Sequence, residues 1–133
     1  MNFFKTYKNK FFLKKSGKLI PITFGKNFPI KAKRIFIIIG KKNEIRGEHA
    51  HKKCYQFFFC LNGAVEISLK NPKIQSRIFL SNKNNKSLLI TPKVWCKIKF
   101  LEKNSIILVI CNRVYEFNDY IEKYDELVKF FKK

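Results

Sequence analysis

The two histidines of this 133-residue chain both lie in residues 46–51, which are Arg-Gly-Glu-His-Ala-His. If this segment is a β-strand, His49 and His51 point to the same face, because successive side chains of a strand alternate between its two faces. Imidazole titrates near neutral pH and also binds metals. A pair of imidazoles therefore suits either a metal site or proton transfer, in which one ring accepts a proton and the other donates one.

The segments that would position these histidines are short and β-like. Runs rich in β-branched and aromatic residues are separated by turn residues, and Asn62-Gly63 is typical of a two-residue hairpin turn. In one run, Val65, Ile67 and Leu69 alternate with polar residues. Ten strands are predicted, at residues 11–14, 19–24, 34–39, 45–51, 55–61, 64–70, 76–80, 87–91, 94–101 and 105–112.

Toward the C-terminus the period changes. Apolar residues recur at helical spacing from Ile121 to Phe131. Asn118 is the expected N-cap, and Asp119 favours the positively charged end of a helix. Many short strands followed by one helix predict an all-β sandwich or barrel with a short C-terminal α-helix. A chain of this length is expected to form a single domain over residues 1–133.

A small β-barrel with two histidines side by side on one strand resembles the cupins, jelly-roll barrels that hold a ligand at their mouth. In metal-binding cupins a glutamate follows the His-x-His pair, and a distant strand supplies a third histidine. Here Gln56 stands where that glutamate is expected, and Trp95 lies near the position of the last ligand. Two imidazoles and an amide are too few for a tight catalytic metal site. We therefore expect a cupin jelly-roll barrel without a metal.

Without a metal, His49 and His51 are best suited to moving protons. The alternative is that they form a polar stripe on a surface strand. Arg46 and Gly47, which precede the histidines in the motif, favour a functional site over a surface stripe. Gly47 allows a close backbone approach or a bulge, and the Arg46 guanidinium can bind a phosphate or a carboxylate through paired hydrogen bonds.

The motif at residues 46–52, followed by Gln56 and Gly63, resembles the signature of the sugar 3,4-ketoisomerases that act on dTDP-4-keto-6-deoxyglucose. These enzymes belong to the cupin superfamily. The resemblance extends over about residues 17–131. It includes the segments 34–36, 91–95, 115–121 and 124–127. Two departures are Asn71-Pro72, where the family usually has an Asp-Gly turn, and Glu122, where it usually has an arginine.

This resemblance implies an isomerisation that uses neither a metal nor a redox cofactor. A base removes the proton at C3 of the dTDP-linked 4-keto-6-deoxyhexose, an enediol or enediolate forms, and reprotonation at C4 leaves the ketone at C3. The product feeds an aminotransferase that makes a 3-amino-3,6-dideoxyhexose for surface glycans. Either His49 or His51 could be the base, and their protonation is expected to be coupled.

The same resemblance suggests which residues bind the substrate. Arg34 and Arg46 are the expected contacts to the pyrophosphate or the sugar, and Gln56 could bind a sugar hydroxyl. Trp95 could line the cavity and stack on the ligand, or it could be an ordinary core aromatic. Two other functions stay open: a nucleotide-sugar epimerase of the same fold, and a sugar-binding cupin without catalysis.

The net charge of +20 raises the question of a nucleic acid or an anionic membrane as partner. However, the 29 cations include only four arginines and are spread along the whole chain. The abundance of Lys, Asn, Ile and Phe is typical of an AT-rich genome. We therefore expect neither a nucleic-acid partner nor a membrane partner.

Residues 1–10 are charged and lack the apolar stretch of a signal peptide, and no apolar run reaches transmembrane length. Cys54, Cys60, Cys96 and Cys111 lie in apolar runs and are expected to be buried free thiols. These features predict a cytoplasmic protein. The family resemblance also implies a homodimer with N-terminal strands paired across subunits. The apolar stretch around Phe11 and Phe12 would suit such pairing, although an ordinary edge strand is the alternative.

Overall fold

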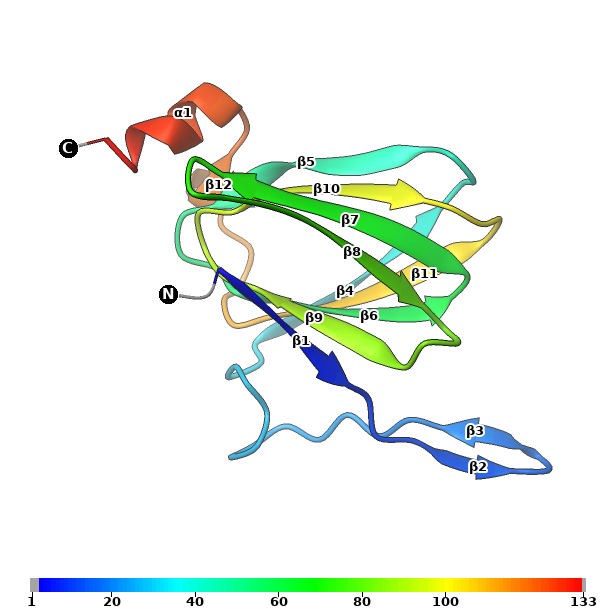
Figure 1. The fold of residues 1–133 in the computed structure, drawn as a ribbon. Helices are drawn as coiled ribbons and strands as arrows, with labels where there is room; N and C mark the ends of the chain where they lie inside the picture. Colours follow the sequence, from blue (N-terminus) through cyan, green and yellow to red (C-terminus); the bar gives the residue numbers. More distant parts are fainter. Residues whose placement is uncertain (1–2, 133) are drawn as a thin grey trace.

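The computed structural model describes residues 3–132 as two five-stranded antiparallel sheets that face one another (Figure 1). The first sheet has the strand order β1-β9-β6-β11-β4. Its strands are β1 (Phe4–Lys8), β9 (Lys86–Ile90), β6 (Gln56–Asn62), β11 (Ser105–Cys111) and β4 (Arg34–Gly40). The second sheet has the order β12-β5-β10-β7-β8. Its strands are β12 (Tyr120–Ile121), β5 (Ile45–His51), β10 (Trp95–Phe100), β7 (Ala64–Asn71) and β8 (Ile74–Ser81).

The inward-facing side chains of both sheets form one apolar core. The core forms because apolar and polar side chains alternate along the strands. In β7, Val65, Ile67 and Leu69 are fully buried, while the polar residues between them face outward. Phe100 and Ile107 meet them from other strands of the two sheets. The predicted all-β jelly roll with a C-terminal helix is thus confirmed. Its sheets face one another as a sandwich and do not close into a continuous barrel.

The outer face of the first sheet is covered by an irregular segment, residues 20–33, which follows β3 (Gly17–Leu19). Ile22, Phe28 and Ile30 belong to the apolar cluster on that face together with Phe57 of β6. A strand predicted at 19–24 was therefore wrong. Pro21 in its middle has no backbone N–H to donate to a sheet, and burial of the apolar side chains needs no strand here.

The N-terminal residues form an edge strand and a separate two-stranded sheet. The edge strand, β1, was not predicted from the sequence, and it pairs with β9 at the edge of the first sheet. A separate two-stranded sheet, formed by β2 (Phe12–Lys14) and β3, extends away from the sandwich at the lower right of Figure 1. We call this two-stranded sheet the N-terminal arm.

The C-terminal helix begins later than predicted. Helix α1 spans Tyr124–Lys129 and has Lys123 at its N-cap, whereas Asn118 lies in the short 3-10 helix η1 (Phe117–Asp119). Between η1 and α1 the chain is extended, because β12 pairs with β5 there. Leu127 packs against Ile121 on the outer side of β5, so the helix holds the strand that carries the histidines. Neither helix within residues 3–132 could span a bilayer.

Candidate active site

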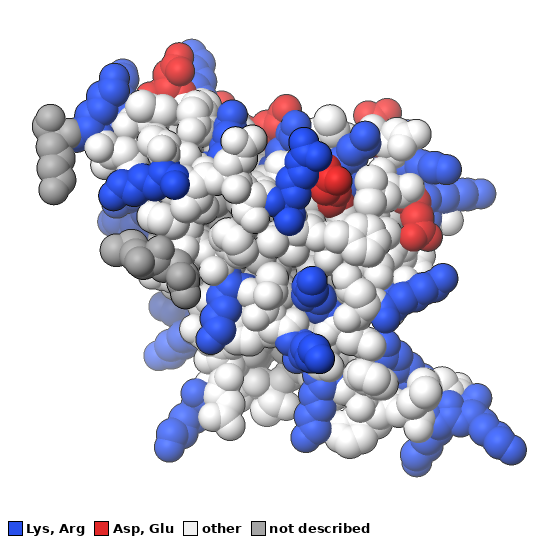
Figure 2. All heavy atoms as spheres, viewed as in Figure 1, with Lys and Arg blue, Asp and Glu red and all other residues white. Residues whose placement is uncertain are grey.

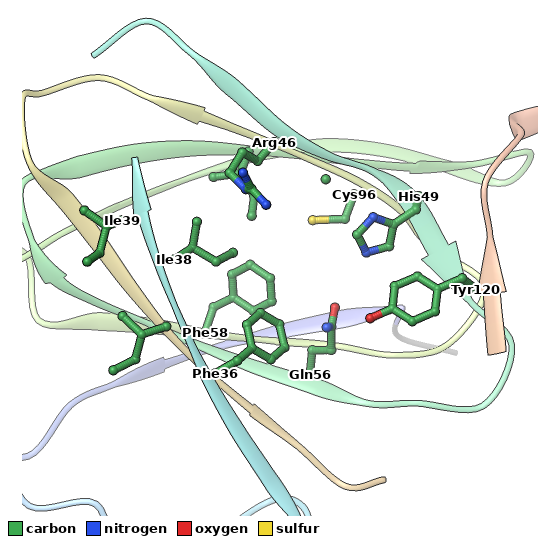
Figure 3. A pocket seen from close by; sticks show the side chains of 12 residues that line it. Phe36, Ile38, Ile39, Arg46, His49, Gln56, Phe58, Cys96 and Tyr120 are labelled. Atoms are coloured by element: carbon green, nitrogen blue, oxygen red, sulfur yellow. The ribbon is translucent and has the colours of Figure 1, made fainter. Parts of the chain in front are cut away.

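A cavity of about 600 Å³ opens between the two sheets. Its volume lies in the usual range for small-molecule sites. One wall is apolar and includes Phe36, Ile38 and Phe58. The polar lining comes from four residues on three strands: Arg46 and His49 of β5, Gln56 of β6, and Tyr120 of β12 (Figure 3).

A β-bulge in β5 places Arg46 and His49 on the same wall. Arg46 is paired with Ile98 and His49 with Cys96, so β5 has one more residue than β10 between these two pairs. Gly47 has φ 90° and Glu48 has φ 61°. A Cβ on residue 47 would lie 2.9 Å from the carbonyl oxygen of Cys96, so the close approach requires glycine. The bulge that Gly47 suggested in the sequence is present.

The two histidine rings lie together but differ in exposure. Their centroids are 5.2 Å apart, and the Tyr120 ring lies 4.5 Å from His51 and 5.1 Å from His49. His49 lines the cavity, whereas His51 is only 6% exposed and lies deeper in the protein. Nε2 of His51 is buried and has no hydrogen-bond partner among the described residues.

Asp119 determines which nitrogen of His51 carries the proton. Its Oδ2 lies 2.9 Å from Nδ1 of His51, and the carboxylate also accepts the backbone N–H groups of Lys53 (2.7 Å) and Cys54 (3.3 Å). Burial opposes the ionisation of Asp119, but these hydrogen bonds lower its pKa. The hydrogen bond with His51 has the largest lowering effect. Because an ionised carboxylate only accepts hydrogen bonds, Nδ1 of a neutral His51 must carry the hydrogen, and Nε2 keeps its lone pair.

Both imidazoles favour the neutral form more than a histidine in water does. Burial lowers the pKa of His49, although a hydrogen bond with the backbone of Gly47 acts in the opposite direction. Burial also lowers the pKa of His51, against the raising effect of Asp119. The sequence analysis missed Asp119 as a partner of His51 and assigned it to the start of a helix. Its place in the segment 115–121, which carries the family resemblance, was the available signal.

Arg34 lies beside the site but does not line the cavity. It begins β4 opposite Cys111, and its Nη2 lies 3.7 Å from Sγ of that residue. The guanidinium also packs over the rings of Phe36 and Tyr115, 5.2 and 5.4 Å from their centroids. The neighbouring thiol of Cys54 and the guanidinium of Arg34 lower the pKa of Cys111, although burial acts against them.

Trp95 does not lie where it would stack on a ligand in this cavity. It lies on the opposite face of β10 from Cys96, which lines the cavity. Trp95 borders a separate hollow, and its ring meets that of Tyr124 edge-on at 5.8 Å. The other interpretation, that Trp95 is an ordinary packed aromatic, fits this position, because Trp95 packs against the apolar cluster around Leu127.

Within residues 3–132, a group of side chains other than the His49, His51 and Gln56 set expected from cupins could hold a metal ion. The donor atoms of His51, Cys54 and Asp119 all lie within 4.8 Å of one another. Gln56, which replaces the glutamate of metal-binding cupins, lies instead with its amide 4.0 Å from Sγ of Cys111.

Comparison with known proteins gives one consistent family. Residues 5–132 match the family model FdtA, described as WxcM-like, C-terminal. A TDP-4-oxo-6-deoxy-alpha-D-glucose-3,4-oxoisomerase from Aneurinibacillus thermoaerophilus is 34% identical over 118 residues, which are 88% of this chain and 84% of the relative.

Solved structures agree with this match. QdtA, a sugar 3,4-ketoisomerase from Thermoanaerobacterium thermosaccharolyticum in complex with TDP, has 33% identity and a TM-score of 0.89, over 96% of this chain and 93% of that one. A His-to-Asn mutant of QdtA has been solved with TDP-4-keto-6-deoxyglucose, at 32% identity, a TM-score of 0.90 and coverage of 98% and 94%. WlaRA, a TDP-fucose-3,4-ketoisomerase from Campylobacter jejuni, has 31% identity and a TM-score of 0.86, with coverage of 98% and 96%. The chain therefore belongs to the FdtA family, whose members include TDP-sugar 3,4-ketoisomerases.

Proposed function

We propose that this protein converts TDP-4-keto-6-deoxyglucose into its 3-keto isomer, with His51 as the base. The observation that carries this assignment is the buried Nε2 of His51, which has no hydrogen-bond partner within residues 3–132, together with the contact of 2.9 Å between Nδ1 of His51 and Oδ2 of Asp119. A neutral imidazole in this tautomer has a free lone pair on Nε2 with which to take a proton. Relatives that match nearly the whole chain catalyse the same class of reaction.

The reaction moves hydrogens within one sugar. His51 Nε2 takes the proton from C3, which the neighbouring C4 carbonyl acidifies, and the electron pair of that C–H bond forms a C3–C4 double bond. Negative charge then develops on the C4 oxygen. The C4 oxygen then gains a proton, the C3 hydroxyl loses one, and carbon C4 takes the proton held by His51 Nε2, which leaves a ketone at C3 and a hydroxyl at C4. Oxidation at C3 equals reduction at C4, so the electrons balance without an external acceptor.

His49 is placed to serve the sugar oxygens. It lines the cavity directly, and the His51 ring lies next to it, 5.2 Å away between ring centroids and 4.5 Å from the ring of the lining residue Tyr120. The two rings can therefore divide the work, with His51 acting at C3 and His49 relaying protons to and from the oxygens. Arg46 and Tyr120 also line the cavity and can donate hydrogen bonds to the developing oxyanion.

Binding of the nucleotide sugar uses both walls of the cavity. Arg46 supplies a permanent positive charge for the pyrophosphate, and Gln56 can bond a sugar hydroxyl. The apolar wall of Phe36, Ile38 and Phe58 suits the 6-deoxy methyl group or a face of the sugar ring. Arg34 lies outside this lining, beside Tyr115.

The test is an NMR assay of the purified protein with TDP-4-keto-6-deoxyglucose in heavy water. We expect the carbonyl carbon signal to move from C4 to C3 and deuterium to appear at C4. A product that keeps its ketone at C4 and carries deuterium at C3 would instead identify an epimerase. Unchanged substrate would contradict both enzymatic functions.

Two further proposals concern the setting of the enzyme. Its product is a 3-keto sugar of the kind that an aminotransferase converts into a 3-amino-3,6-dideoxyhexose. Its four cysteines are free and buried, which fits a reducing compartment such as the cytoplasm. We also propose a homodimer, because the N-terminal arm exposes large apolar side chains, including Phe12, Leu13 and Leu19, that a partner subunit would bury.

A further inference from the structure

The cluster of His51, Cys54 and Asp119 includes a thiol that the proposed reaction does not use. Each of the three residues is at most 8% exposed, and their donor atoms lie within 4.8 Å of one another. The chain has no histidine outside residues 49–51, so few other places on it can bind a transition metal tightly.

The cluster is held by different parts of the fold. His51 ends β5, Cys54 follows three residues later in the connection to β6, and Asp119 ends η1. Backbone N–H groups of Lys53 and Cys54 fix the carboxylate, and the backbone N–H of Lys52 donates to the carbonyl of Asp119 at 2.8 Å. The ligand atoms are thus close together before any metal arrives.

An imidazole, a thiolate and a carboxylate are the donor types that Zn²⁺ prefers. In a tetrahedral site with zinc–donor distances of about 2.0–2.3 Å, the donors lie about 3.3–3.6 Å apart. Nδ1 of His51 and Oδ2 of Asp119 are already 2.9 Å apart, so they would separate slightly while Sγ of Cys54 moves inward. Three protein donors leave a fourth position for water.

We propose that His51, Cys54 and Asp119 form a Zn²⁺ site that switches the enzyme off; the inhibitory effect rests on the proposed function, whereas the site itself does not. Zinc bound at Nδ1 takes the place of the hydrogen on that atom. The proton of a neutral ring must then be on Nε2, which can no longer accept the C3 proton. The thiol of Cys54 releases its proton to water as it becomes a ligand.

Charge balance favours this occupant in spite of the nearby cation Arg34. One thiolate and one carboxylate cancel the two charges of Zn²⁺, so the buried centre is neutral. A divalent ion with oxygen preference, such as Mg²⁺, would gain little from the thiolate and the imidazole. The site is therefore selective for Zn²⁺ over Mg²⁺.

The site can be tested without the sugar by using Co²⁺ as a coloured substitute for Zn²⁺. The full-length protein is stripped with a chelator, dialysed free of it, and titrated with CoCl₂. We expect a thiolate-to-cobalt charge-transfer band that saturates at one metal per chain in the wild type and is missing from Cys54→Ser. The matched control is Cys60→Ser, which makes the same change at another buried free cysteine, on β6, and should keep the band.

Inhibition is measured on the same three proteins in the ketoisomerase assay. ZnCl₂ should inhibit the wild type and Cys60→Ser, and the zinc concentration for half inhibition should rise at least about tenfold in Cys54→Ser, since even loss of an outer-shell partner weakens metal binding about 10- to 100-fold. All three metal-free proteins should remain active.

The outcomes separate the two proposals. A cobalt band that is absent from the wild type, or equally strong in Cys54→Ser, would overturn the metal site. Activation by ZnCl₂, or equal inhibition of all three proteins, would overturn the inhibitory role. Protein that shows the Cys54-dependent band but never isomerises the sugar would contradict the proposed function and leave the metal site supported.

Discussion

At the scale of single residues, the proposed chemistry depends on the hydrogen bond between Nδ1 of His51 and Oδ2 of Asp119. The carboxylate sets the tautomer, and burial keeps the ring neutral, because it lowers the pKa of His51. The neighbouring His49 is the residue that meets the cavity. We therefore propose unequal roles for the two histidines, although both belong to the same motif.

Replacing His51 with Asn should remove the base and leave the fold intact. General-base catalysis contributes about 10²- to 10⁴-fold to a rate, so kcat should fall by that factor. Steady-state turnover measures the loss, and a thermal unfolding curve checks that the variant still folds. Activity retained within about tenfold of the wild type, which is below that range, would exclude His51 as the base.

Asp119→Asn tests the positioning role of the carboxylate. An amide can donate to Nδ1 and so favour the tautomer with its hydrogen on Nε2, which is the wrong one for a base. We expect kcat to fall by about 10²-fold or more with little change in KM, because Asp119 is not a lining residue of the cavity. Asp125→Asn, at an exposed position of α1, is the matched control and should behave like the wild type. A rise in KM at constant kcat would argue against this role.

At the scale of elements, the bulge in β5 positions the polar wall of the cavity. It brings Arg46 and His49 to the same face, although they are three residues apart. The adjacent η1 and β12 then deliver Asp119 and Tyr120 to the histidines, because β12 pairs with the end of β5. Helix α1 supports this strand from outside through Leu127.

Gly47→Ala should therefore impair both activity and stability. The added Cβ would lie 2.9 Å from the carbonyl oxygen of Cys96, at a residue with φ 90°. Relief of this contact would shift β5 and misplace His49, and backbone strain of this kind costs about 1–3 kcal/mol. Urea unfolding and turnover measure the two effects. At Gly25 the φ is also positive but nothing lies within 4 Å of an added Cβ, so Gly25→Ala should cost less and keep its activity. Equal losses in both variants would contradict this account.

At the scale of the whole molecule, the sandwich has a cavity between its sheets. The N-terminal arm projects away from it (Figure 1). Figure 2 shows lysine and arginine side chains scattered over the visible face, with the fewer acidic groups mainly near its upper part. On this face the cations do not form a single stripe that would follow a nucleic-acid backbone. The exposed apolar side chains of the arm are the more specific surface feature.

Phe12→Asp should shift the protein from dimer to monomer if the arm packs on a second subunit. The side chain is 52% exposed in one chain, and burial of a charge in an interface is costly. Sedimentation velocity or light scattering coupled to size exclusion measures the mass. Phe79→Asp makes the same change at a half-exposed position of β8, in the other sheet, and should leave the mass unchanged. A wild-type protein that is monomeric at every concentration would exclude the dimer.

Local patterns were sufficient for those features that depend only on neighbouring residues. Strand alternation placed His49 and His51 on one face, Gly47 marked the bulge, and Asn62-Gly63 marked the turn between β6 and β7. The same patterns predicted most strands of the two sheets. Period and turn chemistry act over a few residues, so the sequence carries them directly.

Only the tertiary structure decided which distant groups meet. Asp119 lies 68 residues after His51, and no local pattern joins a carboxylate to a particular imidazole. The sequence left Trp95 as either a cavity residue or a core aromatic, because which face of its strand encloses the cavity depends on how the second sheet packs on the first. Cys54 likewise lies beside His51 and Asp119 only because β5, η1 and β12 pack together in the fold.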